Sequence, residues 1–174
     1  MHVPVASWTD FRPRLLLADL VEGGVDFVVI GGVAVILHAQ PRFTKDLDVC
    51  YATDATNLER TGAVLTALHA RLRGIDEDVP FVADARALRQ TQILTLTTDH
   101  GDIDLLVDPS GAPPYADLRA DAEILDVGGI DVRVASIEHL TAMKRAAGRP
   151  QDLIDVEALE IARRRRGRRR RRPA

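Results

Sequence analysis

The sequence has little of what small secreted proteins and membrane proteins usually depend on. Aromatic residues make up only 4% of the 174 residues, and the single cysteine, Cys50, excludes an internal disulfide. No apolar run approaches the roughly 20 residues that a helix needs to span a bilayer. Residues Met1 to Pro4 also lack the basic stretch, followed by an apolar one, that begins a secretory signal. We therefore expect a cytoplasmic protein that does not enter a membrane.

Charge is distributed unevenly along a chain whose 46% of hydrophobic residues is enough to bury a core. Nine of the 23 basic residues are arginines between Arg163 and Arg172, and the remaining 14 stand against 26 acidic residues. This pattern predicts one acidic domain over residues 1–162 and a disordered polyarginine tail over 163–174. A run of arginines is also typical of arms that bind the phosphates of nucleic acids.

Apolar periodicity and turn residues predict a domain in which helices and strands alternate. Helices are predicted over residues 14–22, 33–39, 55–72, 115–122, 136–147 and from Pro150 onward. Strands are predicted over 25–30, 46–51, 93–97, 103–107, 124–127 and 130–134, and the segment 73–90 has no clear pattern. The order of these elements is typical of an α/β or α+β domain.

Two glycines and two acidic residues form the first candidate for a catalytic site. Gly31 and Gly32 stand between a predicted strand and a short helix, where glycines let backbone N–H groups approach an anion closely. Asp46 and Asp48 are two residues apart on the next strand and therefore lie on one face of it. Two such carboxylates repel each other unless a cation lies between them. Mg²⁺ suits this position because it binds both carboxylates and nucleotide phosphates.

A third acidic residue, Asp104, lies within an otherwise apolar predicted strand. Burying a lone carboxylate costs several kcal/mol unless it is paired or bound to a metal. With this strand beside the strand of Asp46 and Asp48, the three carboxylates predict two metal ions roughly 4 Å apart. Such a pair of ions orients an attacking hydroxyl and stabilises the pyrophosphate that leaves a nucleotide.

With these residues in this order, the chain resembles the DNA polymerase beta-like nucleotidyltransferase superfamily over residues 25–159. The pattern of that superfamily is a glycine-led turn, an acid-x-acid pair and a third acid on a later strand. The sequences Gly31-Gly-Val-Ala34 and Arg42-Phe-Thr-Lys-Asp-Leu-Asp48 look like its AbiEii/MenT-type toxin branch. The stretch Ala142–Asp155 is similar to a further motif of that branch, a lysine-bearing helix followed by Arg-x-x-Asp-x-x-Asp. The resemblance implies a mixed central sheet of the nucleotidyltransferase type, flanked by helices.

The resemblance also implies roles for individual residues. The implied catalytic metal ligands are Asp46, Asp48 and Asp104, of which Asp104 is alternatively the general base on the acceptor hydroxyl. Lys144 would contact the triphosphate. Further contacts to the nucleotide would come from Gly31, Gly32, Arg42, Thr44 and Lys45. The implied cofactor is Mg²⁺, as two ions, with Mn²⁺ as an alternative.

The toxin branch implies transfer of a nucleoside monophosphate from an NTP to RNA, at the 3′ end of a tRNA, beside a cognate antitoxin protein. The chain departs from the superfamily at Gly32, since many members have a serine there whose hydroxyl contacts a phosphate. Two alternatives stay open. One is a small-molecule acceptor, as in aminoglycoside nucleotidyltransferases, and the other is a non-catalytic module that binds nucleotide or RNA.

Overall fold

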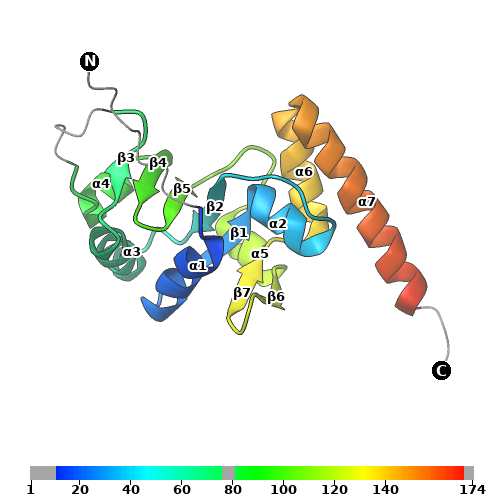
Figure 1. Cartoon of the computed structure of the whole chain (residues 1–174), viewed down its shortest axis with the longest axis horizontal. Coiled ribbons are helices and arrows are strands. Elements are labelled where there is room, and N and C mark those ends of the chain that lie inside the picture. The colour runs from blue at the N-terminus through cyan, green and yellow to red at the C-terminus, as the bar shows by residue number, and fades with distance from the viewer. Residues whose placement is uncertain (1–10, 76–80, 171–174) are drawn as a thin grey trace, which may run out of the picture.

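A mixed sheet forms the centre of the molecule (Figure 1). The computed structural model describes residues 11–75 and 81–170, and within them the strand order is β3-β4-β5-β2-β1-β7-β6. The strands β2 and β5 are parallel, as are β1 and β7, and the other neighbours are antiparallel. The strands are β1 (Phe27–Ile30), β2 (Asp46–Tyr51), β3 (Arg71–Leu72), β4 (Ile93–Thr98), β5 (Gly101–Leu106), β6 (Glu123–Asp126) and β7 (Asp131–Val134).

The burial of each strand follows from its place in the sheet. All four residues of β1 are buried, because β1 lies between β2 and β7 in the middle of the molecule. In β5 and in the first half of β2, burial alternates: Leu47 and Ile103 are fully buried, and their sequence neighbours are not. One face of these two strands therefore belongs to the core, and the other is free to carry polar groups.

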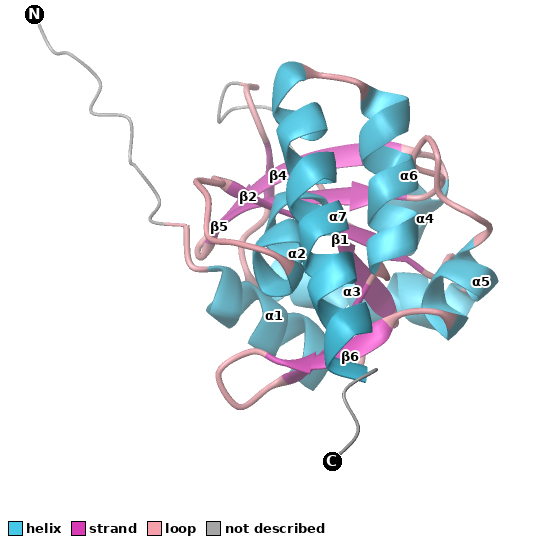
Figure 2. Ribbon diagram, turned by 90° about the vertical axis from the view of Figure 1, so that its right-hand side faces the viewer, coloured by secondary structure: helices cyan, strands magenta, loops and turns pink. Residues whose placement is uncertain are grey.

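The helices lie on both faces and at both ends of the sheet. They are α1 (Pro13–Glu22), α2 (Gly31–His38), α3 (Ala55–Ala67), α4 (Ala85–Arg89), α5 (Tyr115–Ala120), α6 (Ile137–Ala147) and α7 (Pro150–Arg170). In Figure 1, α3 and α4 lie at one end of the molecule and α6 and α7 at the other. Figure 2 shows α2, α6 and α7 in front of the sheet, where α2 contacts both of the other two. In the described part of the chain, no helix combines the length and apolar character that crossing a membrane requires.

The starts and stops of the last two helices follow local sequence rules. The side chain of Ser136 accepts a hydrogen bond from the backbone N–H of His139 and caps α6. Gly148, in the left-handed region at φ +64°, ends α6, and Pro150 begins α7. These boundaries confirm the sequence prediction, as does the mixed α/β architecture with its central sheet.

The middle of the chain differs from the prediction. The helix expected over 55–72 ends at Ala67, and the short strand β3 follows and pairs with β4 at the edge of the sheet. Within the unassigned segment 73–90, Asp84 caps the short helix α4, and residues 76–80 lie outside the described part. Elements this short carry no periodic signal, so their assignment depends on the element that they contact, β4 for β3 and α3 for α4.

The prediction of a disordered tail over 163–174 was wrong as far as Arg170, the last residue described. The helix α7 continues through the arginines, which have a high intrinsic helix propensity. Arg166 also fixes this end of the helix to the domain. It donates to both carboxylate oxygens of Glu123, at 2.9 and 2.8 Å, and lies 3.0 Å from Nδ1 of His38.

Candidate active site

Four carboxylates lie in two rows on the partly exposed face of β2 and β5. The register of these parallel strands sets Asp46 opposite Asp102 and Asp48 opposite Asp104. The strand of Asp104 is therefore the neighbour of the acidic pair, as expected. Asp102 was missed by the sequence analysis, although it stands two residues before Asp104 and alternate residues of a strand share a face.

The glycine turn lies directly against Asp48. Gly31 has a φ of +65°, and a Cβ atom there would lie 1.9 Å from Oδ2 of Asp48. No other residue fits this contact, because its side chain would overlap the carboxylate. The backbone N–H of Gly32 donates a hydrogen bond to the same carboxyl group. The turn thus sets Asp48 beside the N-terminus of α2, where backbone N–H groups and the helix dipole favour negative charge.

The carboxyl group of Asp48 titrates far from its usual range. Burial, together with the negative charges of Asp46 and Asp104, raises the pKa of Asp48 to about 6. The charge of Lys144 and the hydrogen bond from Gly32 act in the opposite direction without outweighing these effects. Among the described residues, no basic side chain forms an ion pair with Asp48. A carboxylate in this condition favours a bound cation.

Arg73, directly after β3, pairs with the other three acids. Its guanidinium donates a hydrogen bond to Oδ1 of Asp104. It also lies 3.2 Å from Oδ2 of Asp102 and 3.7 Å from Oδ2 of Asp46. Burial raises the pKa of Asp104, and the charge of Arg73 acts against this rise. Sequence analysis missed Arg73 because only the pairing of β3 with β4 brings it to the acids.

The acids fit a divalent cation as a pair rather than as a group of three. Within residues 11–75 and 81–170, no three His, Cys, Asp or Glu side chains are grouped so as to hold a metal ion. Asp104 is engaged by Arg73, whereas Asp46 and Asp48 share a face beside a helix N-terminus. Mg²⁺ commonly binds through one or two carboxylates and the phosphates of a nucleotide. The donor chemistry at Asp46 and Asp48 therefore fits Mg²⁺.

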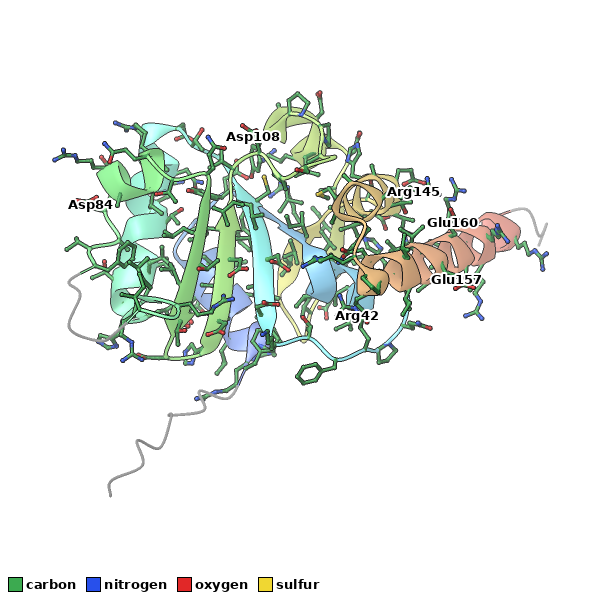
Figure 3. The ribbon with its side chains drawn as sticks, turned by 90° about the horizontal axis from the view of Figure 1, so that it is seen from above. Arg42, Asp84, Asp108, Arg145, Glu157 and Glu160 are labelled. Atoms are coloured by element: carbon green, nitrogen blue, oxygen red, sulfur yellow. The ribbon has the colours of Figure 1, made fainter. Side chains whose placement is uncertain are left out.

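A buried charge network joins α6, α7 and the loop before β2. Nζ of Lys144 lies 3.0 Å from Oδ1 of Asp152 and 2.9 Å from Oδ2 of Asp155. Burial would raise the pKa of Asp152, but hydrogen bonds from Arg149 and Lys144 lower it to about 2. Nε of Arg42 lies 2.9 Å from Oδ1 of Asp155, beside the first turn of α7 (Figure 3). Asp152 and Asp155 therefore join α6, α7 and the loop before β2.

Two cavities meet at Asp48. The first, of about 450 Å³, is lined by charged residues of both signs, with a small excess of basic ones, and is called the basic cavity below: Arg42, Lys45, Lys144 and Arg149 against Asp46, Asp48 and Asp152. The second, of about 280 Å³, is largely apolar, and its walls include Ile93, Leu106, Leu140, Met143 and Ala147. The residues common to both are Asp48, Lys144, Arg149 and Asp152. A basic cavity and an apolar cavity that share one carboxylate suit a ligand with a charged part and an apolar part.

Most of the residues expected at the site meet there. Gly32 lies in the wall of the basic cavity with the expected loop residues, and Gly31 lies in the wall of the apolar one. Lys144 reaches both, although its contacts within the protein are with carboxylates. Asp104 lines neither of these two cavities. Arg149 was not predicted as a site residue, although it begins the Arg-x-x-Asp-x-x-Asp motif.

Solved structures with the same fold define the class of the domain. The lincosamide antibiotic adenylyltransferase LnuA, bound to lincomycin, is 14% identical and superposes with a TM-score of 0.60, covering 85% of this chain and 94% of that chain. ANT(2″)-Ia, in complex with adenylyl-2″-tobramycin, is 17% identical with a TM-score of 0.52, covering 90% of this chain and 95% of that one. No curated protein sequence matches the chain. The fold is therefore of the nucleotidyltransferase type.

The family follows from the sequence match along most of the chain. The model of the family described as nucleotidyl transferase AbiEii toxin, type IV TA system, matches residues 14–165. The chain belongs to this AbiEii family and is a nucleotidyltransferase. This confirms the resemblance to the DNA polymerase beta-like superfamily and to its toxin branch.

Proposed function

We propose that the protein transfers a nucleoside monophosphate from an NTP to an RNA hydroxyl, at the 3′ end of a tRNA, with Mg²⁺ as its cofactor. The observation that carries this proposal is the position of Asp48 at the junction of a basic and an apolar cavity. The triphosphate fits the basic cavity, whose walls carry Arg42, Lys45 and Arg149. The nucleoside fits the apolar cavity beyond it.

In this reaction the acceptor oxygen forms a bond to the α-phosphorus, and the bond from the α-phosphorus to the β-phosphate oxygen breaks. Pyrophosphate leaves, and the acceptor proton passes to a carboxylate or to water. Mg²⁺ at Asp46 and Asp48 would neutralise the charge that develops on the phosphates. Gly32 would donate its backbone N–H at the helix N-terminus, and Thr44 and Lys45 would position the phosphates from the loop. Asp104 would act on the acceptor hydroxyl from the neighbouring strand.

The arginine end of α7 supports RNA as the acceptor. The helix begins in the wall of the site at Asp152, and the exposed arginines Arg163 to Arg165 and Arg168 lie further along it. With a rise of 1.5 Å per residue, these arginines lie roughly 16 to 24 Å along the helix from the site. A polyanion that enters the site fits this layout, whereas a polycationic aminoglycoside would be repelled by the arginines.

A small-molecule acceptor is the second candidate, and the apolar cavity of about 280 Å³ beside Asp48 favours it. The two structural neighbours named above act on antibiotics, but their low identity makes them evidence for the fold alone. A third candidate is a non-catalytic module that binds nucleotide or RNA. The complete set of acids, and the cavities that Asp46 and Asp48 line, argue against this third candidate.

A labelling experiment separates the three candidates. The protein is incubated with Mg²⁺ and each α-labelled NTP in turn, with total tRNA in one arm and lincomycin or tobramycin in another. The proposal expects labelled tRNA from wild type, loss of label with Asp48→Ala and Asp104→Ala, and retention of label with the surface control Asp131→Ala. Label on an antibiotic alone would select the second candidate. Absence of any label, or label that survives both acid substitutions, would exclude the mechanism.

The family description also places the protein in a toxin-antitoxin system. We infer that it acts in the cytoplasm, where NTPs and tRNA are found, and that a cognate antitoxin protein restrains it. The transfer of a nucleotide to tRNA 3′ ends would block aminoacylation, which accounts for toxicity. Growth arrest on expression, relieved by Asp48→Ala, is the expected result in cells.

A further inference from the structure

Arg73 is the one described basic residue that forms ion pairs with the acidic face of β2 and β5. It reaches three of the four carboxylates with its three nitrogens: Nη2 to Asp104, Nε to Asp102 and Nη1 to Asp46. Nη2 also lies 3.4 Å from the backbone oxygen of Leu96, on the neighbouring strand β4. The Arg73 side chain is only 26% exposed. Its contacts with the three carboxylates and with Leu96 fix the orientation of the guanidinium.

The contacts of Arg73 divide the four acids into two pairs. Asp102 and Asp104 are both engaged, since Asp102 also accepts a hydrogen bond of 2.8 Å from Oγ1 of Thr97. Asp46 is 3.7 Å from the guanidinium, at the outer limit of an ion pair, and Asp48 has no ion pair among the described residues. The uncompensated negative charge therefore lies on Asp46 and Asp48.

The cavities divide the acids in the same way. Asp48 lines both cavities and Asp46 lines the basic one, whereas neither Asp102 nor Asp104 lines either. A nucleotide that fills these cavities would contact Asp46 and Asp48. Asp104 and Arg73 line neither of the two cavities.

We propose that the Arg73 guanidinium permanently occupies the position of a second cation, so that the protein binds one divalent ion, at Asp46 and Asp48. The fixed positive charge of Arg73 offsets part of the negative charge of Asp102 and Asp104, and its hydrogen bond orients Asp104, so Arg73 is a positioning residue. Since a guanidinium offers several donors in a rigid plane, it holds two carboxylates apart in a way that a lysine ammonium does not. This inference rests on the proposed function, which supplies the divalent ion.

Counting bound ions tests the inference without any transfer reaction. Each protein variant is dialysed to equilibrium against saturating Mn²⁺ without nucleotide, and bound manganese per chain is measured on both sides of the membrane. The double variant Asp46→Asn/Asp48→Asn serves as the blank for ions held elsewhere on the acidic surface. After subtraction we expect about one Mn²⁺ per wild-type chain and about two per Arg73→Gln chain.

Three matched variants control the count. Arg60→Gln removes a surface arginine and should stay at the wild-type value. Arg73→Lys keeps the charge and should also bind a single ion. Arg73→Gln/Asp104→Asn removes both partners and should return to a single ion, which assigns the second ion of Arg73→Gln to Asp104. If Arg73→Gln alone fails to fold, the wild-type count of one ion against two remains the test.

Two ions in wild type, no ion in wild type, or one ion in folded Arg73→Gln would each overturn the inference. The proposed function fails on a different result, the absence of label transfer, so the two failures are distinguishable. A protein that transfers nucleotide and binds two ions would keep the function and lose the role assigned to Arg73.

Discussion

Position 32 is crowded by two side chains of the loop before β2. A Cβ atom on Gly32 would lie 2.7 Å from Oγ1 of Thr44 and 2.8 Å from Nη2 of Arg42. Real Cβ atoms essentially never approach other atoms so closely. The Thr44 hydroxyl thus lies beside the place that a side chain at position 32 would enter, and Thr44 and Gly32 both line the same cavity. We infer that Thr44 supplies the hydroxyl that the Gly-Gly turn lacks.

A reciprocal exchange tests this role. Thr44→Ala should raise the KM for the NTP roughly 10-fold, as expected for loss of a hydrogen bond to a charged phosphate. The double variant Gly32→Ser/Thr44→Ala should recover much of that loss, because the alanine removes the nearer of the two crowding atoms and the end of the flexible Arg42 side chain can shift. KM is measured from pyrophosphate release. Equal KM values for the single and the double variant would show that Thr44 acts in some other way.

The carboxyl group of Asp48 should make stability depend on pH in the metal-free protein. Its folded-state pKa of about 6 lies above the ordinary 3.8, so its contribution to stability is present in full below pH 3.8 and is lost as pH rises through 6. Asp48→Asn lacks this loss and should exceed wild type by up to about 3 kcal/mol above pH 7. Below pH 3.8 the difference should vanish.

Urea unfolding in EDTA at several pH values provides the measurement. The exposed residue Asp131 offers the control, since Asp131→Asn should stay within about 0.5 kcal/mol of wild type throughout. If Asp48→Asn were less stable than wild type at neutral pH, the Asp48 carboxylate would stabilise the fold by itself and would not need a bound cation.

At the scale of elements, the contact of α6 with α7 depends on buried charge. Lys144 is 7% exposed and pairs with Asp152 and Asp155, each 1% exposed. Removal of one partner from such a group leaves an uncompensated buried charge. Lys144→Met should therefore lower the free energy of unfolding by about 3 kcal/mol.

The neighbouring residue on α6 is the control for this change. Arg145 forms an exposed ion pair with Glu160, and Arg145→Ala should cost less than about 1 kcal/mol. Chemical denaturation gives both values. Equal effects of the two substitutions would mean that the buried network adds nothing, and Lys144 would then be free to serve the triphosphate alone.

Local sequence signals predicted most elements but not the contacts between distant ones. Three features depend only on residues that are close in sequence, so they were predicted: the Gly31-Gly32 turn, the Asp46/Asp48 strand and the cap of α6. The placement of Asp104 beside Asp48 was expected, yet the register that also brings Asp102 there is a property of the sheet. Arg73 follows a strand of two residues, which has no periodicity to detect. Its three acidic partners lie on other strands, each about 30 residues away along the chain.

The arginine end of α7 is a second case in which the sequence did not predict a contact between distant residues. Composition alone predicts disorder for a run of like charges. The structure keeps this run helical to Arg170, and the partners of Arg166, which are Glu123 and His38, lie far from it in sequence. Charge composition therefore predicted the chemistry of this segment but not its conformation.

At the scale of the whole molecule, α7 should carry RNA affinity. Replacement of the exposed arginines 163, 164, 165 and 168 by glutamine should weaken tRNA binding by one to two orders of magnitude at low salt. The slope of log affinity against log salt should fall by about 3. Thermal stability should not change, because Arg166 keeps its contacts. Binding is measured by filter retention across a salt series.

Three exposed arginines at the opposite end of the molecule provide the matched control. The variant Arg60→Gln/Arg86→Gln/Arg89→Gln changes charge by a similar amount on α3 and α4. An equal loss of affinity in this variant would mean that net charge, rather than the arm formed by α7, sets RNA binding.

We propose that Asp46 and Asp48 serve nucleotidyl transfer rather than another reaction of an NTP. One comparison tests it most directly, in which the same NTP is labelled at the α-phosphate in one reaction and at the γ-phosphate in another, with Mg²⁺ and total tRNA. We predict that α-label joins tRNA, that γ-label leaves as pyrophosphate, and that Asp48→Asn abolishes both. Transfer of γ-label to an acceptor, or α-label transfer undiminished in Asp48→Asn, would contradict the account.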